Sequence, residues 1–460
     1  MHPPDRTNRR SFLMSTAGTV AASGLMSSAA PAVPSRAFGP NDRVRIATVG
    51  MGIIGFIDTR TALKVPGVEL VAVSDVYEGR RVHSKEVFGS NIDAVIDYRD
   101  VLARKDVDAV LLCVPDHWHA RMSIDAMKAG KAVYCEKPMM RTVEEGPGMI
   151  QVQKETGVVF QVGSQYASSV VFQKLKGVLA SGAIGKLHAV EARYNRNSAL
   201  GAWQYSIPTD ASAETVDWDR FLGDSPRRPF DADRFFRWRK YWDYGTAVAG
   251  DLFVHLLTGI HVATGSLGPT RVAAMGGKRF WDDGREVYDV IMGLLDYPET
   301  PAHPAFTLSL QADFEDGSGD NSLFRFVGSD GVVDVGFDSF KVNRVGTSQA
   351  STQAILKGYN SVVTFSDGQQ ATFAAKLKGE APAPARPSGS NSPDSFKAPA
   401  GYDSRLDHFA RFFESIREGK PVEEDATFGY RAAAPSLLCN ESYRQGKMLG
   451  WNPVAMRATG

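Results

Sequence analysis

The sequence predicts an α/β protein in which a doubly wound parallel sheet is followed by an α+β part with an open, mostly antiparallel sheet. Two observations predict this fold class. Up to Gly163, short continuous apolar strands alternate with helical stretches, a pattern typical of a parallel sheet that helices cover on both faces. Beyond Gly163 the strands are longer and alternate apolar with polar residues, which is typical of an antiparallel sheet.

The apolar runs give the expected elements in order. Buried strands are expected at 44–49, 70–74, 94–96, 109–114, 132–135 and 158–162, with helices at 54–64, 117–129 and 143–156. In the second part, strands are expected at 187–194, 306–312 and 323–335, the last around the turn Gly328-Ser329-Asp330-Gly331. Apolar residues at helical spacing before Gly419, and the stretch from about 428 to 445, predict two C-terminal helices.

The first residues are typical of a twin-arginine export signal. The pair Arg9-Arg10 precedes a mildly apolar stretch at 12–26, and Ala30-Pro31-Ala32 offers small residues suited to cleavage. The stretch is too short and too weakly apolar for a stable membrane span. We therefore expect residues 1–40 to be a signal peptide with its linker, and the protein to be periplasmic or secreted; a frayed basic N-terminus is the alternative.

Length and composition limit the class of protein. The 460 residues suit two domains, which we expect at 41–165 and 166–460, with a loop or linker at 376–401 inside the second. The 52 basic and 52 acidic residues cancel, so no overall charge favours nucleic acid or anionic lipid as a partner. The three cysteines lack paired spacing, which argues against a disulfide framework.

The first strand runs directly into Gly50-Met51-Gly52-Ile53-Ile54-Gly55, which predicts a dinucleotide site in a Rossmann-type sheet. A tight glycine turn between a strand and a helix exposes backbone N–H groups and the positive helix end to a pyrophosphate. Asp75 ends the next strand, where its carboxylate can accept hydrogen bonds from the ribose hydroxyls and would repel a 2′-phosphate. NAD is therefore expected rather than NADP, although Arg80 and Arg81 weaken that preference.

Lys137, Asp251 and His255 are the candidate catalytic residues. Lys137 follows the strand 132–135 at the carboxyl edge of the sheet, where ligands of open α/β sheets bind, and Pro138 fixes its backbone. Asp251 and His255 lie at i and i+4 of an expected helix, so that they share one face and can orient each other. A histidine with a near-neutral pKa can take a hydroxyl proton while hydride leaves the same carbon. The alternatives are a surface lysine and a buried structural histidine.

Taken together, these residues resemble the Gfo/Idh/MocA family of oxidoreductases, named for glucose-fructose oxidoreductase, inositol dehydrogenase and the rhizopine catabolism protein. The resemblance covers nearly all of the chain after the export signal. It is carried by the glycine motif, Pro115-Asp116-His117-Trp118-His119, Glu136-Lys137-Pro138, Asp251 with His255, and Glu424-Asp425-Ala426-Thr427-Phe428-Gly429. The resemblance implies that Lys137 holds the reacting hydroxyl, that His255 is the base, and that Asp251 supports the substrate or the histidine. It also implies that one face of the second sheet closes the substrate cleft and that the other often forms an oligomer interface.

Motifs and resemblance together give the expected binding residues. The cofactor is expected at Gly50, Gly52, Ile53, Ile54, Gly55, Asp75, Pro115, His117, His119, Glu136, Lys137 and Gln165. The carbohydrate or cyclitol substrate is expected at Lys137, Tyr166, Tyr194, Arg237, Trp238 and His255. No metal site is expected, because His117 and His119 diverge on a helix and no further ligand is spaced to complete one.

The segment 195–244 is rich in tryptophan and arginine. Aromatic rings can stack on sugars and arginines can bind hydroxyls, so this composition suits a carbohydrate cleft. It equally suits a subunit interface, with plain core packing taking part of either interpretation. Interleaved aspartates argue against a nucleic-acid groove. We expect a homo-oligomer, a dimer or a tetramer.

Three functions remain open from the sequence. The first is an NAD(P)-dependent oxidoreductase that moves hydride between a tightly bound nicotinamide cofactor and a hydroxyl of a sugar, sugar derivative or cyclitol. The second is a redox-neutral NAD-dependent glycosidase, which needs an additional base for which Tyr166, Tyr194 and Tyr241 are candidates. The third is a non-catalytic periplasmic binding protein, which the presence of Lys137, Asp251 and His255 opposes.

Overall fold

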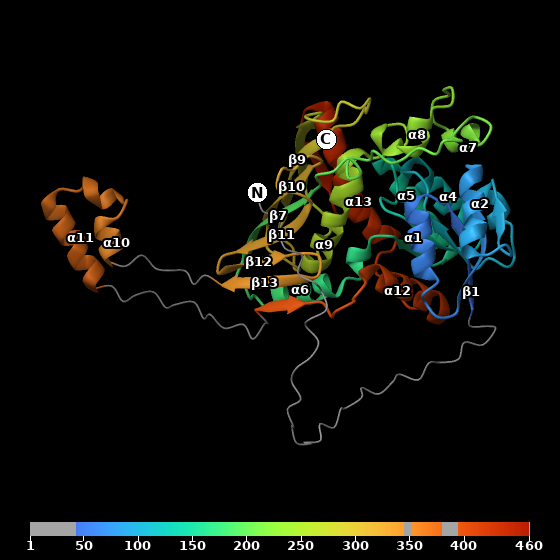
Figure 1. Ribbon diagram of the computed structural model, residues 1–460. Coiled ribbons are helices and arrows are strands. Elements are labelled where there is room, and N and C mark those ends of the chain that lie inside the picture. Colours follow the sequence, from blue (N-terminus) through green and yellow to red (C-terminus); the bar gives the residue numbers. More distant parts are fainter. Residues whose placement is uncertain (1–42, 345–351, 380–393, 460) are drawn as a thin grey trace, which may run out of the picture.

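A parallel sheet forms the first part of the structure (Figure 1). The computed structural model describes residues 43–344, 352–379 and 394–459, so the export signal expected at 1–40 lies outside the described residues. Six parallel strands follow the order β3-β2-β1-β4-β5-β6. They are β1 (Val44–Val49), β2 (Val68–Ser74), β3 (Asp93–Val95), β4 (Ala109–Leu112), β5 (Ala132–Cys135) and β6 (Phe160–Val162). The predicted doubly wound sheet is thereby confirmed.

Helices connect the strands of this sheet. They are α1 (Ile53–Ala62), α2 (Glu78–Phe88), α3 (Tyr98–Leu102), α4 (Asp116–Lys128) and α5 (Gly146–Thr156), the last preceded by a 3-10 turn η2 (Val143–Glu145). Because β2 and β4 both pair with β1, the strand order reverses beside β1, and the carboxyl ends of the strands open a crevice there.

The second sheet is mixed and mostly antiparallel, as predicted. Its ten strands follow the order β14-β13-β12-β11-β7-β10-β9-β8-β15-β16, and among them β7 and β10 form the one parallel pair. The strands are β7 (Leu187–Asn195), β8 (Arg271–Gly277), β9 (Val290–Tyr297), β10 (Phe306–Asp313), β11 (Asn321–Gly328), β12 (Gly331–Val335), β13 (Ser339–Arg344), β14 (Ser395–Lys397), β15 (Leu449–Asn452) and β16 (Arg457–Thr459).

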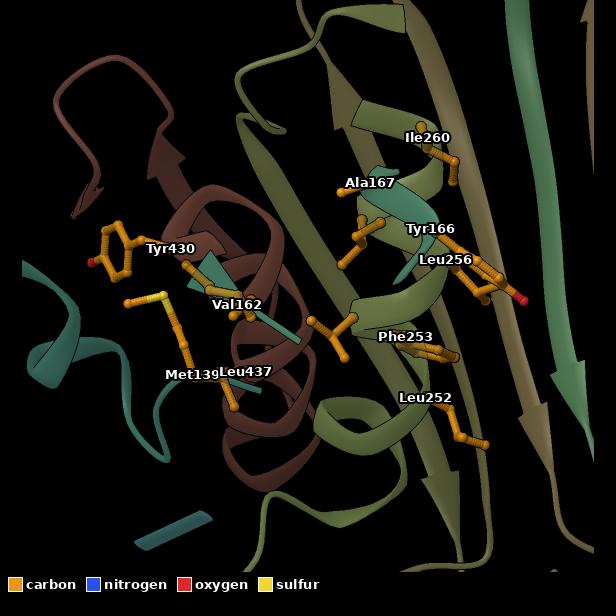
Figure 2. Packing of buried hydrophobic residues seen from close by; sticks show 14 of the residues in the cluster. Met139, Val162, Tyr166, Ala167, Leu252, Phe253, Leu256, Ile260, Tyr430 and Leu437 are labelled. Atoms are coloured by element: carbon orange, nitrogen blue, oxygen red, sulfur yellow. The ribbon is translucent and has the colours of Figure 1, made fainter. Parts of the chain in front are cut away.

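The largest hydrophobic core lies where helices join the two sheets. Its longer helices are α6 (Val170–Ala180), α9 (Val254–Thr264) and α13 (Ala426–Gln445), with the short turns η3 (Gln165–Ala167) and η5 (Ala249–Phe253), a π-helix, leading into them. Figure 2 shows Phe253, at the end of η5, and Leu256, on α9, facing the strands, while Met139 and Val162 lie near Leu437 of α13. This packing fixes the second sheet against the carboxyl edge of the first.

The helix α12 (Ser404–Glu418) completes the core of the first sheet although it lies far along the chain. Its side chains Phe409, Phe412 and Phe413 are fully buried against a cluster that includes Ile46 and Tyr134. The Phe409 ring stacks on Tyr134 with centroids 4.3 Å apart. The boundary expected at 165 therefore separates the two sheets, but it does not separate their cores.

The stretch expected as a loop or linker, 376–401, contains regular structure at both ends. The helix α11 (Asp367–Gly379) runs into it, and β14 lies inside it and pairs with β13; residues 380–393 lie outside the described residues. With α10 (Thr352–Lys357) and η6 (Ser361–Thr364), α11 forms a small helical unit, which Figure 1 shows apart from the second sheet.

Close packing between α6 and α9 gives a test of this core. A Cβ added at Gly259 would lie 2.7 Å from ring atoms of the buried Phe172, whereas one added at Gly177, on α6, meets nothing within 4 Å. We expect Gly259→Ala to lower the free energy of unfolding by about 1 to 3 kcal/mol because the core is overpacked. Denaturant titration measures it.

Gly177→Ala is the matched control, because alanine favours a helix interior and finds open space there. Equal stability of the two variants would contradict the described contact between α6 and α9.

Candidate active site

A cavity of about 960 Å³ lies at the carboxyl ends of β1, β2, β4 and β5. Its floor is formed by residues that end these strands, and its opposite wall comes from the segment between Tyr205 and Arg239. The cavity therefore occupies the point of the sheet at which the strand order reverses, where open α/β sheets bind ligands.

The glycine turn beside this cavity has the geometry that a dinucleotide requires. Gly50 has a φ of +88°, and a Cβ there would lie 2.5 Å from the carbonyl oxygen of Cys113. A Cβ on Gly55 would collide with the Gly50 carbonyl, whereas one on Gly52, which lines the cavity, would meet only the Arg80 guanidinium, at 3.9 Å. The helix α1 begins at Ile53 with no side-chain cap. Its first N–H groups and its positive end are therefore available to a pyrophosphate.

Asp75 at the end of β2 holds the glycine turn in place. Its Oδ2 accepts a hydrogen bond of 2.7 Å from the backbone N–H of Met51, and its Oδ1 accepts one of 2.8 Å from Tyr77. The guanidinium of Arg80 lies 3.6 Å from the same carboxylate, and both residues line the cavity. Asp75 thus sits where the ribose is expected, but part of its accepting capacity serves the turn itself.

The segment 205–244, which we call the clasp, closes the other side of the cavity. It contains α7 (Trp218–Leu222), α8 (Ala232–Phe236) and the 3-10 turn η4 (Trp238–Lys240), and Figure 1 shows α7 and α8 next to the first sheet. Backbone hydrogen bonds join Glu78 N to Thr215 O and Asp217 N to Val76 O. The indole N–H of Trp118 donates to the Phe221 carbonyl at 2.9 Å. The clasp is therefore bonded to the cofactor half of the chain at both β2 and α4.

Most aromatic residues of the clasp pack against one another. A separate hydrophobic cluster is made of Tyr77, Val216, Trp218, Phe221, Leu222, Phe235, Phe236, Tyr241 and Tyr244. Arg237 pairs with Asp233 at 2.8 Å and donates to the Tyr205 carbonyl, and Arg234 pairs with Glu286 at 2.6 Å. Core packing, one of the interpretations left open by the composition, accounts for these rings. The clasp residues that line the cavity include Arg220, Phe221, Arg227, Phe235, Phe236, Trp238 and Arg239.

Lys137 and Asp251 form a buried ion pair at one end of the cavity. The Lys137 Nζ lies 2.8 Å from Asp251 Oδ1 and 3.0 Å from the Asp251 carbonyl oxygen, and the two side chains are 11% and 8% exposed. Arg239 Nε lies 3.3 Å from the same carboxylate oxygen. Burial alone would raise the pKa of Asp251, but the charges of Lys137 and Arg239 hold it well below its usual range. Asp251 is therefore a carboxylate held between two cations.

His119 holds the loop that carries Lys137 in place. The His119 Nδ1 lies 2.6 Å from the Pro138 carbonyl oxygen and its Nε2 lies 2.8 Å from that of Val114, and the peptide between Lys137 and Pro138 is cis. His119 thus ties the loop after β4 to the loop after β5, which sets the position of the Lys137 backbone.

His255 is a neutral imidazole beside this ion pair. Burial, together with the nearby charge of Lys137, lowers its pKa well below the ordinary value. Its Nδ1 is buried without a hydrogen-bond partner among the described residues. The rings of Tyr166 and Tyr194 lie 5.8 and 5.9 Å from it. A neutral histidine with an unoccupied nitrogen can accept a proton from a ligand placed there.

The cavity brings together most of the residues predicted for the cofactor. Its lining includes Gly50, Gly52, Ile53, Ile54, Asp75, Pro115, His119, Glu136 and Lys137. Gly55, His117 and Gln165 do not line it: Gly55 packs against Gly50, His117 Nε2 faces the Phe221 carbonyl at 2.8 Å, and Gln165 begins η3. Among the residues predicted for the substrate, Tyr166, Tyr194 and His255 lie together, and Arg237 is turned into the clasp.

Three residues near the site were given no individual role from the sequence. Arg239 pairs with Asp251, and Arg196 follows β7 beside Tyr194. Asp116 lines the cavity, accepts a hydrogen bond from Thr246 at 2.7 Å, and has its pKa raised to about 7 by burial. The arginine-rich composition pointed toward Arg239, but only the fold shows which arginine reaches the carboxylate.

Among the described residues, no group of three or more His, Cys, Asp or Glu side chains is arranged to hold a metal ion. Among these residues no helix is long and apolar enough to cross a membrane.

Comparison with known proteins agrees with the geometry of the first sheet. Residues 44–164 match the family described as the oxidoreductase family with an NAD-binding Rossmann fold. A myo-inositol 2-dehydrogenase of Thermotoga maritima is 33% identical over 147 residues, which is 32% of this chain and 44% of that protein. A glycosyl hydrolase family 109 protein of Shewanella baltica is 33% identical over 162 residues, which is 30% of this chain and 35% of that protein. The chain thus spans less than half the length of these relatives.

Among solved structures, a levoglucosan dehydrogenase in complex with NADH shares the fold. The TM-score is 0.61 at 18% identity, and the match covers 89% of this chain and 99% of that one. The two-sheet architecture is therefore common to both proteins.

The buried ion pair gives a stability prediction. We expect Asp251→Asn to lower the free energy of unfolding at neutral pH by roughly 3 to 5 kcal/mol, because Lys137 and Arg239 then remain without their shared anion. The pKa of Asp251 is lower in the folded than in the unfolded chain, so its ionised form stabilises the fold above the unfolded pKa of about 4. This stabilisation is lost as the pH falls from that value toward the folded pKa. Denaturant titration at several pH values measures both effects.

Glu69→Gln serves as the control, because its pair with Arg43 is about half exposed and should contribute within about 1 kcal/mol. A loss for Asp251→Asn no larger than for this control would mean that the pair does not stabilise the fold.

Proposed function

The chain belongs to the Gfo/Idh/MocA family of oxidoreductases, and on that premise we propose that it transfers hydride between a nicotinamide cofactor and a hydroxyl of a sugar, sugar derivative or cyclitol. One observation carries this proposal: the ammonium of Lys137 is held by the Asp251 carboxylate at the end of the cofactor cavity, and the neutral imidazole of His255 is near enough for both charges to act on its pKa. A hydroxyl placed there meets both a donor and a base.

Each residue of this group has a distinct task. Lys137 donates a hydrogen bond to the substrate oxygen and stabilises the negative charge that grows on it as the O–H bond weakens. His255 accepts the hydroxyl proton on a ring nitrogen, which its lowered pKa keeps free at neutral pH. Asp251 orients the Lys137 ammonium through its carboxylate and its carbonyl oxygen. In the reverse direction the same residues return the proton to a carbonyl oxygen.

The residues of the cavity suit NAD. When bound, NAD supplies the acceptor for the hydride. The turn at Gly50 and Gly52 and the start of α1 suit its pyrophosphate, and the Asp75 carboxylate suits a free ribose better than a 2′-phosphate. Arg80, 3.6 Å from Asp75, is already committed to that carboxylate and to the rings of Phe235 and Phe236. This commitment supports NAD over NADP.

The clasp supports tight retention of the cofactor. It is bonded to β2 and α4 through backbone and indole hydrogen bonds, and its own hydrophobic cluster makes it a packed unit rather than an open loop. Release of a dinucleotide requires these contacts to open. Retention would also serve a protein exported through the twin-arginine pathway, which we propose from Arg9-Arg10 and the stretch that follows.

A redox-neutral glycosidase is the second candidate, because it uses the same residues and a retained cofactor. The likeness to a glycosyl hydrolase family 109 protein favours it. Such a cycle needs a further base for the carbon acid next to the oxidised carbon. Tyr166 and Tyr194 flank His255 and are suitably near, whereas Tyr241 donates to Asp233 within the clasp.

We also propose that the protein is a dimer or tetramer. The outer face of the second sheet exposes Met275, Met292 and Leu294 on neighbouring strands β8 and β9, a surface suited to a second copy of the chain.

Proton transfer at Lys137 and His255 can be tested by substitution. We expect Lys137→Ala and His255→Ala each to lower kcat/KM by about two to four orders of magnitude, because each removes a group that handles the hydroxyl proton. Absorbance of reduced nicotinamide during turnover of inositol and aldose substrates measures the rate.

His303→Ala is a suitable control. This buried histidine lies between β9 and β10, and its Nδ1 hydrogen-bonds the Pro304 carbonyl. Losses below roughly tenfold at Lys137 and His255 would assign both residues a structural role only.

The state of the cofactor separates the candidate functions. We expect the purified protein to release NAD, not NADP, on acid denaturation, because the clasp holds it through purification. Chromatography of the supernatant identifies the nucleotide.

Incubation without added NAD then distinguishes the activities. Accumulation of reduced nicotinamide with a free sugar supports the oxidoreductase, whereas cleavage of an aryl glycoside with no net reduction supports the glycosidase. Absence of both activities would support a binding protein and overturn the enzymatic proposal.

A further inference from the structure

Arg196 is held in a fixed position next to the proposed catalytic group. It directly follows β7, and its guanidinium carbon lies 5.7 Å from the ring centre of Tyr194 and 5.6 Å from that of Phe314. The Arg196 Nη1 also donates a hydrogen bond of 2.9 Å to the Gly201 carbonyl, which fixes the side chain further. The side chain is half-buried, so the rest of the guanidinium fork remains open to a ligand.

No carboxylate among the described residues lies within ion-pair distance of Arg196, in contrast to the arginines around it. Arg234, Arg237 and Arg285 each have an acidic partner within 3 Å. A guanidinium that is fixed by two rings and a carbonyl, and that makes no ion pair among the described residues, is an ordered receptor for a carboxylate.

Three cations share one carboxylate at this end of the site. Lys137 and Arg239 pair with Asp251, and the charge of Arg196 also lowers the pKa of that carboxyl. His255 beside them is neutral, and the buried Glu136 and Asp116 line the cofactor cavity. A substrate carboxylate would therefore approach three cations that have only Asp251 in common.

The aromatic residues beside Arg196 indicate what else the ligand presents. Tyr194 lies between His255 and Phe337, with ring centres 5.9 and 6.1 Å away, and Phe337 is 57% exposed in the turn between β12 and β13. Such rings pack against the C–H face of a sugar. A carboxylate on the same ring would then be within reach of the guanidinium at the end of β7.

We propose that the substrate is a sugar acid, such as a hexuronate, and that Arg196 binds its carboxylate. This inference rests on the oxidoreductase or glycosidase function proposed above, and it names the substrate class of that same site. The two oxygens of a carboxylate match the planar fork of a guanidinium, which gives orientation as well as attraction. Arg196 would thereby fix which hydroxyl of the ring reaches Lys137 and His255.

Matched sugar pairs test this proposal. D-glucuronate and D-galacturonate are compared with D-glucose and D-galactose, each measured by calorimetric binding to the protein with its cofactor and by reduction of nicotinamide. We expect each uronate to bind at least tenfold more tightly than its neutral counterpart, and this preference to weaken as salt is raised. Arg196→Gln should remove the preference, so that each uronate and its neutral counterpart bind with affinities within about twofold of each other. Arg196→Lys, which keeps the charge but loses the fork, should retain part of it.

Arg60→Gln is the matched control, because Arg60 also lies 5.7 Å from an aromatic ring, that of Phe56, but on the exposed surface of α1. Uronates that bind no better than the neutral sugars, or an Arg196→Gln variant that weakens both classes alike, would overturn the proposal. Turnover of neutral sugars without a uronate preference would refute this inference and leave the proposed function standing. Tight uronate binding without any turnover would leave Arg196 as a carboxylate-binding residue and refute the proposed function.

Discussion

The ion pair between Lys137 and Asp251 is the contact on which the rest of the site depends. Lys137 comes from the loop after β5 in the first sheet, and Asp251 comes from η5 at the start of α9 in the second part of the chain. The pair is buried, and its two hydrogen bonds define the distance between the cofactor edge and the helix that carries His255. Buried charges are stable only when they are paired, so this requirement keeps the two halves in one arrangement.

That pairing also explains why the protonation states of the site differ from those of free side chains. Two cations favour the ionised form of Asp251, while burial and the Lys137 charge favour the neutral form of His255. A carboxylate and a neutral base side by side are what proton transfer from a hydroxyl requires. The charge of Arg196 acts on Asp251 as well, so three cations share this carboxylate.

The sequence predicted those parts of the structure that are determined by neighbouring residues in the chain. The glycine turn, Asp75 and the proline after Lys137 are local signals, and both sheets followed from apolar periodicity. The sequence did not predict features that depend on contacts between residues far apart in the chain. The acceptors of Asp75 are partly used by Met51 and Tyr77, and neither contact is visible in a spacing. Arg196 and Arg239 are two among many arginines, and only the fold distinguishes them from Arg237, which pairs within the clasp.

The placement of α12 has a consequence for how the protein can be made. The apolar face of the first sheet is closed by Phe409, Phe412 and Phe413, which are synthesised long after the strands they cover. Until they arrive, the ring of Tyr134 and the side chains around it stay open to water at a cost of several kcal/mol. The hydrophobic core of the first sheet is thus complete only after α12 has been synthesised, so a fragment that ends at the last strand of this sheet would expose part of it.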